Sequence, residues 1–170
     1  MVDFAGAQSK KLDLKLIQDT CKKTSQTDPN IKYDFCVSAL RADKKSITAD
    51  LQGLGVVSAQ LASANATQTQ AHIAQLLKKK NLDPFDKDCL KACQESYSDA
   101  IYTLNDVVKA FQSKRYGDAN IWVASVMDDS TTCETGFKEK PGHTSPLTKY
   151  NADLFQLGAI ALAISHLLLG

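Results

Sequence analysis

Apolar residues recur at alternating steps of four and three along most of this chain, which is the spacing of one face of an α-helix. The C-terminal series consists of Tyr150, Leu154, Leu157, Ala161, Ile164 and Leu168. A second series with the same spacing consists of Leu90, Cys93, Tyr97, Ala100, Leu104, Val107 and Phe111. Two less regular series run over residues 47–76 and 119–137. With four such segments and no convincing strand pattern, the sequence predicts an all-α fold.

The four segments have helix-start signals and short connections. Ser46, Asp83-Pro84, Asp118 and Ser145-Pro146 stand where the helices should begin. The connections near residues 81–83, 114–117 and 140–145 are short, so successive helices should lie antiparallel. We therefore expect an antiparallel up-down-up-down four-helix bundle over residues 46–169. The chain of 170 residues should form a single domain, residues 1–170.

Residues 10–43 precede the bundle and predict a small helical hairpin. Its centre is TCKKTSQTDPNIKYDFC, a polar run between two cysteines. Leu12, Leu14, Leu16 and Ile17 suggest a short helix before Cys21, and Asp28-Pro29 should start a second one. Two short helices are marginal alone in water, so a disulfide between their ends would substitute for apolar burial. We expect Phe35 and Leu40 to pack the hairpin against its neighbours.

The five cysteines are Cys21, Cys36, Cys89, Cys93 and Cys133. Two bridges and one free thiol allow about fifteen pairings, so counting alone does not decide between them. Cys89 and Cys93 are one helical turn apart, which disfavours a bridge between them. Pairing Cys21 with Cys36 and Cys93 with Cys133 leaves Cys89 free, and would stabilise the fold by about 3 and about 4 kcal/mol. This arrangement indicates an oxidising compartment, and the alternative is five reduced cysteines in a cytosolic protein.

Charge and hydropathy argue against nucleic-acid and membrane partners. Twenty Lys and Arg against nineteen Asp and Glu give a net charge of +1, so no large single-sign field is present. Residues 154–170 are apolar but contain Gln156, Ser165 and His166, which favours a buried C-terminal helix over a membrane span. The opening MVDFAGAQSK lacks the pattern of a secretory signal. The protein should therefore be intracellular, or its signal peptide should already have been removed.

The residue inventory argues weakly against an enzyme. His72, His143 and His166 are isolated and fit no metal-ligand spacing, and no motif for a cofactor is present. A free Cys89 on a helix is more often inert than nucleophilic. Asn65-Ala66-Thr67 is an N-glycosylation triplet, so Asn65 is a candidate for modification if the chain is secreted. We therefore expect no catalysis, no metal and no cofactor.

Three stretches carry a resemblance to a known family. They are TCKKTSQTDPNIKYDFCVSAL, ADLQGLGVVSAQLA and ANIWVASVMDDSTTCETGFKEK. With the hairpin and bundle pattern, they resemble the plant invertase and pectin methylesterase inhibitor family, and within it a pollen branch that contains an allergen. The resemblance covers nearly the whole chain. It implies an all-α inhibitor secreted to the cell wall, or alternatively the vacuole, that forms a 1:1 complex with a carbohydrate-active enzyme.

The resemblance also implies a disulfide pattern. In this family the first cysteine pairs with the second and the third with the fourth. The sequence QESYSDA follows Cys93 as it follows the family's third cysteine, so Cys93 is the third and Cys89 is extra. This is the pairing that helix geometry favours.

The resemblance leaves two target enzymes open. Invertase inhibitors of the family insert a Pro-Lys-Phe turn into the substrate cleft, but the same positions here are Tyr116, Gly117 and Asp118. The family's pectin methylesterase inhibitors use two acids and a threonine, which are matched by Glu95, Asp99 and Thr132. That match is incomplete because an aromatic residue and an acid of the family pattern are replaced by Ala100 and Thr135.

We expect an inhibitor that blocks the active-site cleft of a cell-wall or vacuolar invertase, because of the branch resemblance. A pectin methylesterase inhibitor of the same fold is the first alternative. A non-inhibitory ligand-binding or interaction protein of pollen or the cell wall is the second. For Glu95, Asp99 and Thr132 the competing interpretation is that they are ordinary solvated residues on helix faces.

Overall fold

The computed structural model describes the backbone of residues 4–170 and the side chains from residue 14 onward. The domain start expected at residue 1 and the side chains of residues 10–13 lie outside the described residues. Within the described part, all regular secondary structure is helical, so the all-α prediction is confirmed. The helices are α1 (Phe4–Thr27), α2 (Tyr33–Ala42), the 3₁₀ helix η1 (Lys44–Thr48), α3 (Leu51–Leu77), α4 (Pro84–Gln112), α5 (Tyr116–Lys138) and α6 (Thr148–Leu169).

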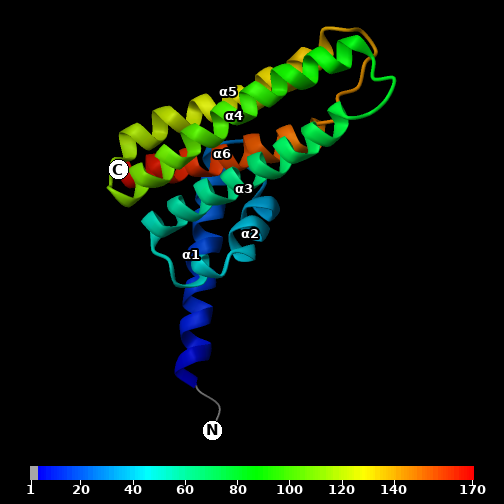
Figure 1. Ribbon diagram of the computed structural model, residues 1–170. Helices are drawn as coiled ribbons and strands as arrows, with labels where there is room; N and C mark the ends of the chain where they lie inside the picture. Colours follow the sequence, from blue (N-terminus) through cyan, green and yellow to red (C-terminus); the bar gives the residue numbers. More distant parts are fainter. Residues whose placement is uncertain (1–3) are drawn as a thin grey trace.

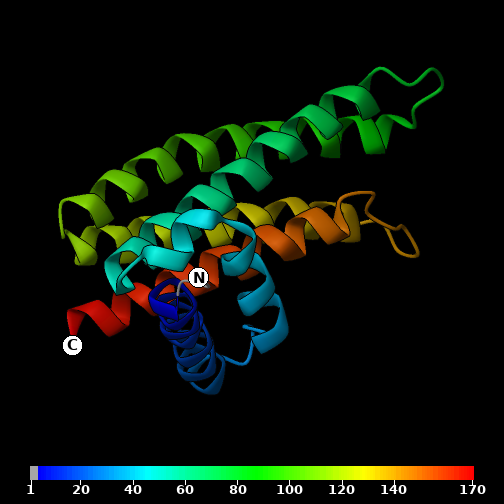
Figure 2. The same cartoon turned by 90° about the horizontal axis from the view of Figure 1, so that it is seen from below.

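The four long helices form a bundle in which each packs against two others. Contacts join α3 to α4, α4 to α5, α5 to α6 and α6 back to α3. Successive helices run in opposite directions, with α4 and α5 forming one layer and α3 and α6 the other (Figure 1). The hairpin of α1 and α2 packs on the α3–α6 layer, as the view from below shows (Figure 2). The outer face of α4 and α5 is therefore on the side of the bundle away from the hairpin.

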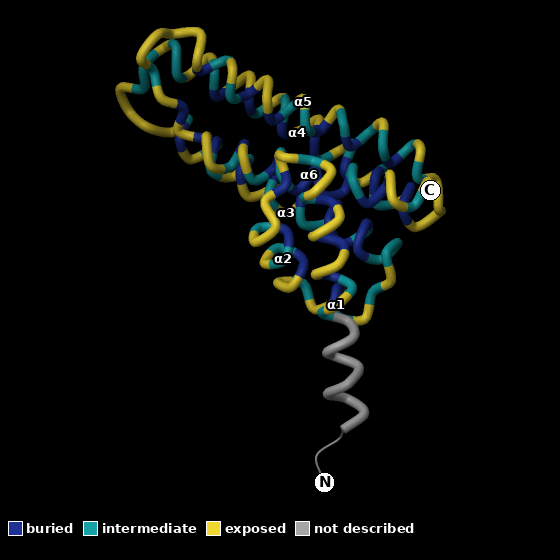
Figure 3. The backbone as a smooth tube through the Cα atoms, turned by 180° about the vertical axis from the view of Figure 1, so that it is seen from behind, coloured by how far each residue is buried: buried dark blue, intermediate teal, exposed yellow. Residues whose placement is uncertain are grey.

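The apolar series seen in the sequence lie in the interior of the bundle. All seven residues of the α4 series are buried, from Leu90 to Phe111. In α6 the central four residues of the series are buried, whereas Tyr150 and Leu168 at its ends are only partly covered. Figure 3 shows buried positions along the inner sides of the helices and exposed ones outside. Burying each Leu, Ile, Val or Phe side chain of these series contributes about 1.5–3 kcal/mol.

The hairpin differs from the sequence prediction in where its helices lie. Helix α1 does not stop near Cys21 but continues through the polar run to Thr27. Helix α2 begins at Tyr33, so Asp28-Pro29 belongs to the turn and does not start the helix. The turn is closed instead by the Asp28 carboxylate, which accepts a hydrogen bond from the Asn30 backbone N–H at 2.9 Å.

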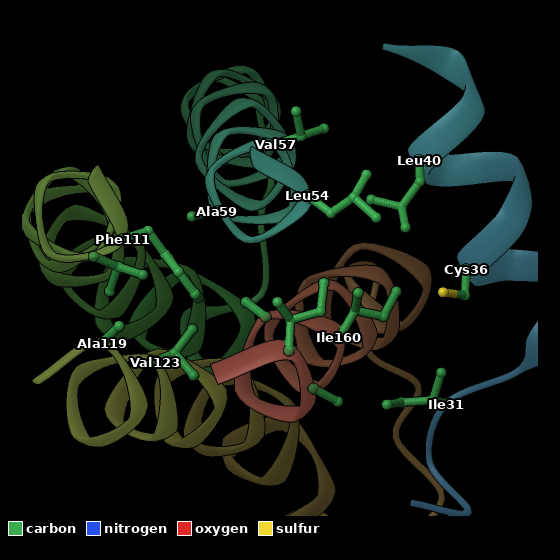
Figure 4. Packing of buried hydrophobic residues seen from close by; sticks show 14 of the residues in the cluster. Ile31, Cys36, Leu40, Leu54, Val57, Ala59, Phe111, Ala119, Val123 and Ile160 are labelled. Atoms are coloured by element: carbon green, nitrogen blue, oxygen red, sulfur yellow. The ribbon is translucent and has the colours of Figure 1, made fainter. Parts of the chain in front are cut away.

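Cys21 and Cys36 are bonded to each other, with their Cα atoms 5.7 Å apart. Both are fully buried, and so are Ile17 and Leu40 beside them. Figure 4 shows Leu40, Cys36 and Ile31 facing Leu54 and Ile160 of the bundle. The hairpin therefore shares one apolar core with α3 and α6.

The first bundle helix begins later than the sequence indicates. Ser46 and Ile47 lie in η1, not in the long helix. Helix α3 begins at Leu51, where the Asp50 carboxylate caps it by accepting a hydrogen bond from the Gly53 N–H at 2.8 Å. The prediction that the long helix begins at Ser46 is wrong. Serine is a common N-cap at the start of any helix, so it does not distinguish a 3₁₀ turn from an α-helix.

Helix α6 is long and apolar enough to span a membrane by length and composition, the one such helix among the described residues. It lies between α3 and α5, with nine buried residues from Asn151 to Ser165. A core helix of a bundle has the same composition, so this feature is weak evidence for a membrane.

Candidate functional site

The register of α4 against α5 is fixed by sulfur contacts near one end of the pair. Cys93 and Cys133 are bonded, with Cα atoms 4.8 Å apart. One turn away, the free Cys89 thiol donates a hydrogen bond to the Gly136 carbonyl at 3.6 Å. Because the helices are antiparallel, residues with higher numbers on α4 lie beside residues with lower numbers on α5.

This register places Glu95, Asp99 and Thr132 on one outer face of the α4–α5 pair. Glu95 and Asp99 are one turn apart on α4, and Thr132 precedes the bridged Cys133 on α5. All three side chains are exposed. Thr132 also lines a shallow hollow between the two helices, together with Ser96 and Cys89. A partner that covers this face could contact all three residues at once.

Asp129 adds a partly buried acid to the same region. Burial raises the pKa of its carboxyl group to about 6, and repulsion from Asp99 and Asp128 adds to the shift. Half of the Asp129 side chains would therefore be protonated at mildly acidic pH. The charge of this region depends on pH between about 4 and 7.

The residues at the positions of the family's Pro-Lys-Phe turn lie in another part of the structure. Tyr116, Gly117 and Asp118 form the first turn of α5, so no loop projects at these positions. Tyr116 is half-buried and packs on the Phe111 ring, 6.2 Å between ring centroids. Asp118 forms an ion pair with Arg115 at 3.1 Å. Along the axis of α4, Asp99 lies about ten residues, or about 15 Å, from the level of this turn, so the structure does not bring the two groups together.

Sequence reasoning did not find a polar network that runs from the core to the surface and links three bundle helices. The Tyr97 hydroxyl of α4 donates to Asn151 Oδ1 of α6 at 2.7 Å. The Asn151 amide and the Thr148 hydroxyl in turn donate to Glu134 of α5, at 2.8 and 2.7 Å. Tyr97 and Asn151 are almost completely buried. Satisfied buried networks specify one packing arrangement, so this one holds α4 and α5 in place beneath their outer face.

The described residues offer little for catalysis or metal binding. Burial raises the pKa of the Cys89 thiol, and the nearby carboxylates of Asp86, Glu139 and Asp88 raise it further. A thiol with a raised pKa is a poor nucleophile. The ring of His143 is hydrogen-bonded to Asp86. Among the described residues, no cluster of His, Cys, Asp and Glu has the makings of a metal site.

Asn65 lies in the middle of α3 and is partly buried. Its Oδ1 atom is buried and has no hydrogen-bond partner among the described residues. A glycan attached to this side chain would have to pass out of a packed helix face, which disfavours glycosylation. Modification of Asn65 stays a prediction.

These features describe a helical bundle that is braced by two disulfides and carries exposed acids on one face. The chain belongs to the plant invertase/pectin methylesterase inhibitor family, whose model matches residues 15–164. Members of this family are protein inhibitors of enzymes. The family expected from the sequence is thus confirmed.

Two relatives show how the family's targets divide. A "Putative invertase inhibitor" of Platanus acerifolia is 50% identical over 153 residues, which cover 90% of this chain and 85% of that protein. A pectinesterase inhibitor of Actinidia deliciosa is 35% identical over 162 residues, covering 95% of this chain and 84% of that protein. In three dimensions the chain is similar to a mutant form of a pectin methylesterase inhibitor from Arabidopsis, with a TM-score of 0.69 and 25% identity. That match covers 79% of this chain and 88% of the other.

Proposed function

We propose that this protein is a secreted inhibitor that covers the active-site cleft of a carbohydrate-active enzyme with the outer face of α4 and α5. One observation carries the proposal: Glu95, Asp99 and Thr132 lie together on a face that the Cys93–Cys133 bridge holds in register. A preorganised face loses little conformational entropy on binding, which favours tight association. Inhibition then needs no chemistry by the chain itself, and one bundle blocks one enzyme.

The target is an invertase of the cell wall or vacuole. The relative from Platanus acerifolia, named for invertase inhibition, supports this choice because half of its aligned residues are identical. The chain lacks the Pro-Lys-Phe turn of the family's invertase inhibitors, and Tyr116, Gly117 and Asp118 lie in a regular helix. Recognition of an invertase would therefore depend on the outer face of α4 and α5 and not on an inserted loop.

Pectin methylesterase is the alternative target, and the position of the acids favours it. Glu95, Asp99 and Thr132 are the residues that match the family's pectin methylesterase inhibitors, and they share one exposed face. The similarity to the Actinidia deliciosa pectinesterase inhibitor points the same way.

Secretion is part of the proposal. The fold contains two disulfides, Cys21–Cys36 and Cys93–Cys133. Structural disulfides persist in oxidising compartments, which include the cell wall, and are rare in the cytosol. The vacuole is the alternative location.

The test is inhibition of both enzymes at acidic pH by the purified, oxidised protein. We expect loss of activity for one of them, and a charge reversal at the face, Glu95→Lys with Asp99→Lys, should weaken inhibition by at least about tenfold. Asp34→Lys, an exposed acid on α2, is the matched control and should leave inhibition unchanged. Full activity of both enzymes with the wild-type protein in excess would refute the proposal.

A hollow between α5 and α6 supports a second candidate, a non-inhibitory ligand-binding protein. Glu134, Lys138 and Phe155 are among the residues that line it. This candidate predicts a sugar or apolar molecule that stays bound through purification, or saturable binding there, without any effect on either enzyme.

A further inference from the structure

Tyr102 and Ile121 are the most exposed large apolar side chains of the described residues. Their exposed fractions are 75% and 68%, whereas the next, Leu169 at the end of α6, has 55%. A single exposed apolar residue is ordinary on a protein surface. These two are unusual because of where they lie.

Tyr102 belongs to the line of residues on α4 that contains two of the proposed contact residues. Steps of four, three and four place four side chains along one side of the helix: Glu95, Asp99, Tyr102 and Asp106. Ile121 lies on a line of α5 with the same steps: Ile121, Ser125, Asp128 and Thr132. Together these eight residues are called the α4–α5 face.

The two lines lie side by side on that face. Two contacts set the register: Cys93 is bonded to Cys133, and Cys89 contacts Gly136. In each pair the two residue numbers add to nearly the same value, so a step back along α4 is matched by a step forward along α5. Continuing this register along the antiparallel helices brings Glu95 beside Thr132 and Asp106 beside Ile121. The apolar pair therefore occupies one half of the face and extends the surface beyond Glu95, Asp99 and Thr132.

The charge of the face is of one sign between its ends. It carries four carboxylates, on Glu95, Asp99, Asp106 and Asp128, and the next residues on the same line of α4 are Lys91, before Glu95, and Lys109, after Asp106. The ion pairs within the described part of the chain involve other acids, namely Asp83, Asp86, Asp118 and Asp153. The negative charge of the face is thus available to a partner.

These properties determine which partner fits. A second copy of the chain would set acids against acids across a two-fold axis, and an anionic membrane would repel the face. A protein surface with basic residues around an apolar pocket complements both the carboxylates and the two exposed side chains. The hairpin packs on the opposite layer and leaves the face open (Figure 1).

The geometry points to Tyr102 and Ile121 as the anchors by which this chain binds its target enzyme, whose contact surface is basic around an apolar pocket. This inference rests on the proposed function and adds two binding residues and the chemistry of the partner. Buried aromatic and aliphatic anchors contribute most of the binding energy in protein interfaces, and surrounding charges mainly raise the association rate.

The experiment compares the wild-type protein with Tyr102→Ser, Ile121→Ser and the double variant against the enzyme that the wild type inhibits. The inhibition constant of the double variant should rise at least about tenfold. Tyr33→Ser is the matched control, because Tyr33 is an exposed tyrosine on α2. It should leave the inhibition constant unchanged, and circular dichroism should show all variants folded. The association rate of the wild-type protein should fall as salt is added.

The outcomes separate the two proposals. If the wild-type protein inhibits neither enzyme, the proposed function fails and the inference fails with it. If the wild type inhibits and the folded double variant inhibits equally well, only the anchor assignment is overturned. An association rate that does not respond to salt would contradict a basic contact surface.

Discussion

Tyr97 places a hydroxyl group in the core of the bundle, where it needs a hydrogen-bond partner. Its place in the α4 series predicts that it is buried, and it is. The series does not show that its hydroxyl needs a partner, because that partner, Asn151, lies 54 positions later in the chain. Burial raises the pKa of Tyr97, so the hydroxyl stays protonated and can donate. Apolar periodicity records burial, whereas polar networks depend on the tertiary fold.

Asp129 makes stability depend on pH. Its pKa in the folded state is raised to about 6, above the usual value of 3.8, mainly by burial. The folded state therefore binds the proton more tightly than the unfolded state. Its favourable contribution is complete below about pH 4 and is lost as pH rises through about 6.

We expect Asp129→Asn to be more stable than the wild type at about pH 7, by about 1 kcal/mol after allowance for solvent screening. At about pH 4 the two proteins should be equally stable, because Asp129 is then neutral. Urea unfolding at both pH values measures this. Asp34→Asn is the control, since Asp34 is an exposed acid on α2 that takes no part in the pKa shift of Asp129. An Asp129→Asn effect that is the same at both pH values would show that the carboxyl does not titrate as described.

At the scale of elements, the polar run of α1 is the clearest difference from the sequence prediction. The run from Thr20 to Thr27 has no apolar face, so periodicity gave no reason to continue the helix. In the structure its hydroxyl groups bond back to the helix. Thr24 donates to the Thr20 carbonyl at 2.9 Å, and Thr27 donates to the Lys23 carbonyl at 3.2 Å. Cys21 in this run is bonded to Cys36 of α2, and Thr24, three residues further on, is buried as well.

The hairpin should be the first part of the molecule to open when its disulfide is removed. The Cys21–Cys36 bridge spans 15 residues and contributes about 3 kcal/mol. In a Cys21→Ala, Cys36→Ala variant, we expect faster hydrogen exchange in α1 and α2, with protection kept in α3–α6. The opposite case is also informative. Because Ile17 and Leu40 share a core with Leu54 and Ile160, equal loss of protection throughout would mean that hairpin and bundle unfold as one unit.

At the scale of the whole molecule, the sequence predicts the helical class, the order of the helices and the buried series. The two disulfides of the structure are the pairs that helix geometry and the family resemblance favour. Helix starts were predicted less well, since Ser46 lies in a 3₁₀ helix and Asp28 lies in a turn. Local polar residues favour many kinds of turn, so they do not fix a boundary without the tertiary context.

The proposed contact surface could be predicted from the sequence only in part. Glu95, Asp99 and Thr132 came from a family pattern, and the structure shows that they share a face. Neither apolar periodicity nor the family pattern singles out Tyr102, because one aromatic residue among polar ones carries no periodic signal. Its significance depends on Ile121, which the antiparallel packing of α5 brings to the same surface. Such a pair is visible only once two helices are placed side by side.

The central claim is that one folded bundle blocks one enzyme without acting on the substrate. Titration of a fixed, high concentration of the sensitive enzyme with the oxidised protein tests this most directly. Activity should fall linearly and reach its minimum at one bundle per enzyme, and the chain alone should leave sucrose and methylated pectin unchanged. Activity that persists with excess protein, or turnover of either substrate by the chain itself, would contradict it.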